Sequence, residues 1–93
     1  MTHEERQRAL EAAALLDSQV FREALVALDG RYVKAWRGAT GPEERELWWL
    51  RQQVLADVRR ELLAWVTSAA VRAGGGDGQL NAALRRAGER KDG

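Results

Sequence analysis

The chain has 93 residues, of which 45% are apolar and 31% are charged, with no cysteine. This length allows one domain with a thin core, and this composition is typical of a folded protein rather than a disordered one. Disulfide bonds and thiolate metal sites are excluded. The 15 basic and 14 acidic residues nearly balance, so no overall field attracts the chain to nucleic acid or to an anionic membrane.

The N-terminus carries no targeting signal that we can identify. It begins Met1-Thr2-His3-Glu4-Glu5, without the basic and apolar regions of a signal peptide. No apolar run approaches the ~18 residues of a membrane-spanning helix. We therefore expect a protein that stays in the cytoplasm and has no membrane partner.

Two helices are predicted before the only proline. The first spans residues 4–16, with a narrow apolar stripe made of Ala9, Leu10, Ala13 and Leu16. Asp17-Ser18 interrupts it with side chains that favour helix N-caps, which predicts a kink or a new start. The second helix runs from about Ser18 to Arg37 and carries a stronger stripe, formed by Phe21, Ala24, Leu25, Leu28, Tyr32, Ala35 and Trp36.

A turn at Gly38–Pro42 leads into a long third helix. Glycine ends helices readily and proline suits a first helical position, so this helix is expected to span Pro42–Ala73. Its inner stripe is predicted to consist of Leu47, Leu50, Val54, Leu55, Val58, Leu62, Trp65, Val66 and Ala69. Residues 74–78 form a glycine-rich linker, and residues 79–93 form a short helix or a flexible basic tail.

These elements predict an all-α fold built on an antiparallel helical hairpin, because a short connection makes adjacent helices antiparallel neighbours. The hairpin domain comprises residues 1–73, with the first and second helices forming one bent arm against the straight third helix. The first helix is expected to cover residues 61–73 of the third. Two helices enclose only a seam, so we expect a second copy of the chain or another protein of an assembly to complete a bundle.

Apolar residues outside the two inner stripes indicate where such a partner would bind. Trp49, Ala56 and Leu63 share one side of the third helix, and Val26 and Val33 lie off the main face of the second. A bundle with further neighbours buries helices on more than one side, which favours an interface at these five residues. The alternative is that they are isolated exposed apolar residues, which are common on protein surfaces.

No set of residues predicts catalysis or a cofactor. His3 is the only histidine, and it lies in a terminus where a base would not be held in place. The acidic residues of the third helix lack the Glu-x-x-His pattern of a carboxylate metal site in a bundle. The glycines at 74–78 lack the lysine and hydroxyl residue of a phosphate loop. We therefore expect no enzyme, no metal, no cofactor and no small-molecule substrate.

Basic residues leave a second function open. Arg59, Arg60, Arg85 and Arg86 are possible phosphate contacts, and Arg90-Lys91 adds charge to the tail. Neighbouring acidic residues such as Asp57 and Glu61 dilute this charge, which favours an ordinary solvated face. The alternative to an interaction module is a nucleic-acid-associated or regulatory small protein, including an inhibitor of a host protein.

The segment from Leu15 to Val66 resembles small helical-hairpin proteins encoded among the head and packaging genes of bacteriophages. The residues that carry the resemblance are Leu15-Leu16-Asp17, Val20-Phe21, Ala24-Leu25, Tyr32-Val33, Ala35-Trp36, Glu46-Leu47-Trp48, Val54-Leu55, Val58-Arg59 and Leu62. The glycine linker and the tail lie outside it. The resemblance implies a phage assembly or virion component without enzymatic activity, located in the host cytoplasm or in the virion.

Overall fold

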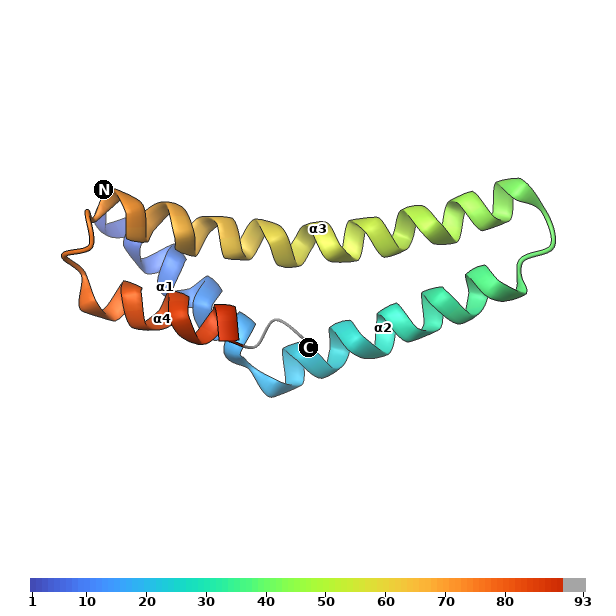
Figure 1. The fold of residues 1–93 in the computed structure, drawn as a ribbon, viewed down its shortest axis with the longest axis horizontal. Coiled ribbons are helices and arrows are strands. Elements are labelled where there is room, and N and C mark those ends of the chain that lie inside the picture. The colour runs from blue at the N-terminus through green and yellow to red at the C-terminus, as the bar shows by residue number, and fades with distance from the viewer. Residues whose placement is uncertain (90–93) are drawn as a thin grey trace.

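The computed structural model, which describes residues 1–89, consists of four helices in chain order. They are α1 (His3–Asp17), α2 (Gln19–Gly38), α3 (Pro42–Arg72) and α4 (Gly78–Glu89). The molecule is elongated, 53 × 22 × 18 Å, and α3 runs along most of its length with α2 folded back beside it (Figure 1). The predicted all-α hairpin is confirmed, and no strand occurs within residues 1–89.

Local chemistry sets the break between α1 and α2. The Ser18 hydroxyl accepts a hydrogen bond from the Phe21 amide at 3.3 Å, while the Ser18 amide donates to the Leu15 carbonyl at 3.0 Å. One residue thus ends one helix and begins the next, satisfying free backbone groups on both sides. The break between α2 and α3 has no capping side chain. Gly41 occupies the N-cap position of α3, and Pro42 begins its first turn.

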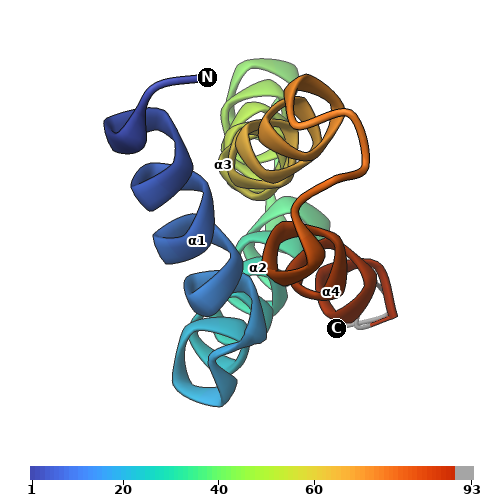
Figure 2. The same cartoon turned by 90° about the vertical axis from the view of Figure 1, so that its left-hand side faces the viewer.

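The buried core lies at one end of the molecule, where α1, the last part of α3 and α4 pack together (Figure 2). We call this region the three-helix core. Its buried residues are Ala9, Ala12, Ala13, Leu16, Val66, Ala69, Ala70, Leu80, Ala83 and Ala87. Most of them are alanines, which allow close approach of the helices. The prediction that the first helix covers the end of the third with its alanine face is confirmed.

A polar clasp attaches the start of α4 to α1. The Arg6 Nε donates to Asp77 Oδ2 at 2.7 Å, and Arg6 Nη2 donates to Gln79 Oε1 at 2.7 Å. Asp77 also caps α4, since its Oδ1 accepts from the Leu80 amide at 3.2 Å. The Arg6 side chain first, and then the Leu80 amide, hold the pKa of Asp77 below its ordinary value. The segment after the linker is therefore a docked helix as far as Glu89.

The other end of the molecule, which we call the distal half, is formed by α2 and residues 42–58 of α3. No residue of α2 is buried, and the buried residues of α3 all lie in the three-helix core. The two helices meet through half-buried side chains, including Tyr32 and Trp48, whose ring centroids are 5.8 Å apart. The distal half is thus a two-helix seam without an enclosed core.

Part of the predicted inner stripe of the third helix is wrong. The four residues Leu47, Leu50, Val54 and Val58 retain 44–60% exposure. Leu55 and Leu62 of the predicted stripe are half-buried, and Trp48, which lay outside the prediction, is half-buried beside them. Successive residues of a helix differ by ~100°, so the seam keeps the Leu55 and Leu62 side of the predicted stripe and extends past it to Trp48. The aromatic contact between Tyr32 and Trp48 fixes this orientation of α3 towards α2.

Candidate protein-interaction surface

Four of the five residues predicted to form an interface lie in the distal half. Trp49 is 45% exposed and Val26 is 55% exposed, while Val33 and Ala56 are half-buried. Leu63 differs, because it is half-buried and packs against the three-helix core.

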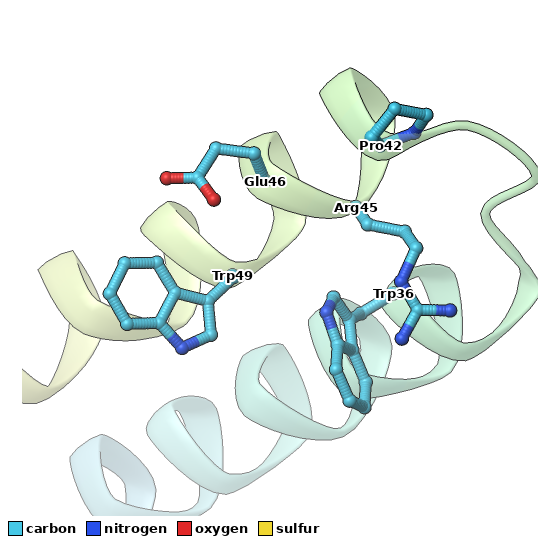
Figure 3. Close-up of a pocket in the computed structure, with 5 residues that line it drawn as sticks. All are labelled: Trp36, Pro42, Arg45, Glu46 and Trp49. Carbon is cyan, nitrogen blue, oxygen red and sulfur yellow. The ribbon is translucent and has the colours of Figure 1, made fainter.

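Trp49 forms one side of a notch beside the turn between α2 and α3 (Figure 3). The notch has a volume of about 530 Å³, is open to solvent, and is lined by Trp36, Pro42, Arg45, Glu46 and Trp49. The Arg45 guanidinium stacks on the Trp36 ring, with its central carbon 4.8 Å from the ring centroid. Figure 3 shows that Arg45 reaches Trp36 from the turn side, whereas Trp49 projects on the opposite side of the notch.

The notch combines an exposed indole with a carboxylate and a guanidinium at its rim. Tryptophan and arginine are the residues most often found at the energetic centres of protein interfaces, since they combine large apolar area with directional polar groups. Ligand pockets for small molecules instead enclose most of the ligand surface. An open notch of this kind therefore suits an apolar side chain presented by another protein.

A second apolar surface was not predicted, because sequence reasoning placed its residues inside the hairpin. Leu47, Leu50, Val54 and Val58 form a continuous exposed line on α3, which we call the Leu47–Val58 stripe. Trp65 continues the line seven residues after Val58 and is covered there by α1, with the Arg8 guanidinium carbon 4.9 Å from its ring centroid. The sequence signal was the presence of two apolar stripes on one helix, of which a single partner helix covers only one.

The four possible phosphate contacts lie on two helices. Arg59 is half-buried in α3, and the adjacent Arg60 is exposed and forms an ion pair with Asp57. Arg85 is exposed on α4. Arg86 lines a groove of about 380 Å³ between α1 and α4. Arg90 and Lys91 lie outside the described residues.

The residues considered for catalysis or metal binding form no metal-binding cluster in the part of the chain that the structure describes. His3 is exposed at the first position of α1. Within residues 1–89, no three histidine or carboxylate side chains gather in a way that would hold a metal ion. The same residues contain no helix with the length and apolar character needed to cross a bilayer.

No protein-family model, curated protein or solved structure matches the chain significantly.

Proposed function

We propose that this protein is a non-enzymatic helical interaction module that binds another protein of an assembly, and that this assembly belongs to a bacteriophage. The observation that carries the proposal is the distal half, in which two helices pack without one buried residue in α2. Apolar side chains remain exposed there, as Trp49 and Val26 illustrate. A surface of this kind gains free energy when another protein covers it.

Trp49 is the proposed anchor of the contact. A tryptophan side chain offers 150–250 Å² for burial, and its 45% exposure leaves a large share of that area to a partner. The neighbouring Glu46 and Arg45 provide charged groups at the edge of the notch, where they would fix the orientation of a bound protein. The bacteriophage context rests only on the resemblance of residues 15–66 to head and packaging proteins.

Affinity capture with single-residue variants tests this proposal. The tagged wild-type chain, Trp49→Ala and Val71→Ala are expressed in the host cells, and the captured proteins are identified by mass spectrometry. Val71 is 72% exposed on the same helix and outside the notch, so Val71→Ala is the matched control. We expect one identified protein to be lost with Trp49→Ala and retained with Val71→Ala. If every captured protein is retained equally by both variants while both stay helical, the notch is not the binding site.

The nucleic-acid alternative makes a different prediction. Binding through the basic residues would weaken steeply as salt concentration rises, because counterions are released from phosphates. The ion pair between Arg60 and Asp57 and the net charge of +1 both weigh against it. We expect no salt-dependent binding to duplex DNA.

A further inference from the structure

We infer that the protein bound at the notch contributes an arginine, whose guanidinium stacks on the Trp49 ring and pairs with the Glu46 carboxylate. The inference rests on the proposed function, because it concerns the same notch, and it names the chemical group that the partner presents there. Two features of the molecule carry it. One is the way in which the other three tryptophans are covered, and the other is the charged group beside Trp49.

Each of the other three tryptophans is covered by an arginine of the chain itself. The guanidinium carbon lies between 4.5 and 4.9 Å from the ring centroid, where the negative face of the indole attracts it. The pairs are Arg8 with Trp65, Arg45 with Trp36, and Arg51 with Trp48. Arg51 lies one turn from its tryptophan on α3, whereas the other two arginines reach across from another helix. The contact therefore does not follow from one local spacing.

Trp49 lacks such a cover. Within residues 1–89, no arginine or lysine lies over its ring, and it is the most exposed of the four tryptophans, the other three being half-buried. Arg45 lies one turn before Trp49 on α3, but its guanidinium reaches across the seam to Trp36 instead. The chain thus presents one indole whose face is open to a cation from another molecule.

The Glu46 carboxylate gives this open indole a charge that complements a cation. Glu46 precedes Trp49 by three residues, so the two side chains are neighbours on the surface of α3. Figure 3 shows both of them projecting away from Arg45, which keeps its positive charge on the far side of the notch. Glu46 forms no ion pair with any residue that the structure describes. Its carboxylate is therefore available to a partner.

An arginine uses both groups, because its planar guanidinium stacks on an indole while the N–H groups at its edge donate to a carboxylate. Other occupants fit less well. A nucleobase would stack on Trp49, but Glu46 would repel its phosphates. A proline-rich segment docks between aromatic side chains, and here Arg45 already covers Trp36. A lysine ammonium has no flat face and is more strongly hydrated.

An amino-acid probe tests the recognition without any partner. The four indole N–H signals of the ¹⁵N-labelled chain, assigned with Trp→Phe variants, are followed during titration with N-acetyl-arginine amide at constant ionic strength. N-acetyl-citrulline amide is the uncharged control. Such a contact is weak, so probe concentrations of ~100 mM are needed, and we expect the Trp49 signal to move ~3-fold further with arginine than with citrulline. The three covered tryptophans should respond little. Equal shifts of all four signals, or equal shifts with both probes, would overturn the inference.

Two neutral variants test the part played by the carboxylate. Glu46→Gln removes the charge beside Trp49, and Glu43→Gln removes the same charge from the first turn of α3, outside the notch. We expect Glu46→Gln to reduce the arginine-induced shift of the Trp49 signal by ~3-fold and Glu43→Gln to leave it unchanged. A Glu46→Gln chain that responds as the wild type does would also overturn the inference.

The capture experiment separates this inference from the proposed function. The protein that is lost with Trp49→Ala should be captured in smaller amount by Glu46→Gln than by Glu43→Gln. If the arginine probe gives no selective shift while Trp49→Ala still loses that protein, the notch is a protein-binding site and only the arginine is ruled out.

Discussion

Leu80 carries much of the attachment of α4, and its truncation gives the sharpest stability prediction. Its side chain is 0% exposed and packs with Ala9, Ala69 and Ala70 from the two other helices of the three-helix core. Leu80→Ala removes three carbon atoms, which corresponds to ~2.4 kcal/mol of lost burial at ~0.8 kcal/mol each. The cavity left behind raises the expected cost to about 3 kcal/mol. This is a large share of the ~5–15 kcal/mol typical of a small domain.

Urea unfolding followed by circular dichroism measures this cost, with all variants at one protein concentration because association shifts the apparent stability. Val71→Ala is the control, since Val71 is 72% exposed on α3 and its truncation should change stability by less than ~0.5 kcal/mol. Limited proteolysis at the glycine linker should also be faster in Leu80→Ala than in the wild type. A Leu80→Ala protein within ~0.5 kcal/mol of the wild type would refute a core that includes α4.

Four further predictions concern single residues, and each is tested by the midpoint of urea unfolding. Gly30→Ala should stabilise the chain by about 0.5–1 kcal/mol, because alanine favours a helix more than glycine does and a Cβ at this position of α2 meets no atom within 4 Å. Gly74→Ala should destabilise the chain by ~1 kcal/mol, because the backbone there has a φ of +62°, which alanine rarely adopts. Ser18→Ala should cost ~1 kcal/mol through loss of the cap of α2. Arg6 holds the pKa of Asp77 in the folded chain below its value in the unfolded chain. The ion pair therefore stabilises the fold fully above the unfolded-state pKa of Asp77, and this stabilisation is lost as the pH falls through the folded-state pKa. Asp77→Asn should make the free energy of unfolding depend less on pH over this range.

Local sequence signals account for the helices and their order. Ser18, Gly41 and Pro42 act through their own backbones and neighbouring amides, so their effect on helix ends was predictable from the sequence. The alanine face of the first helix was also predictable, because Ala9 and Ala13 recur at helical spacing within one apolar stripe. Each of these features depends on residues that are close in sequence.

The orientation of α3 and the docking of α4 depend on residues that are distant in sequence. Apolar residues occur at several angles around α3, so spacing alone did not decide whether Leu47 or Trp48 faces α2, and the contact with Tyr32 decides it. The tail had the spacing of a helix, but its docking depends on Asp77 meeting Arg6, 71 residues earlier. The Leu47–Val58 stripe could not be identified as a surface until that orientation was known.

Hydrogen exchange of the isolated chain tests most directly whether the chain has a core of its own at one end and needs a partner at the other. Amides of the three-helix core should be strongly protected, because one chain encloses them. Amides of residues 47–58 should exchange quickly, because only a two-helix seam covers them. Equal protection of both regions would contradict the account, since the two-helix seam would then be stable alone.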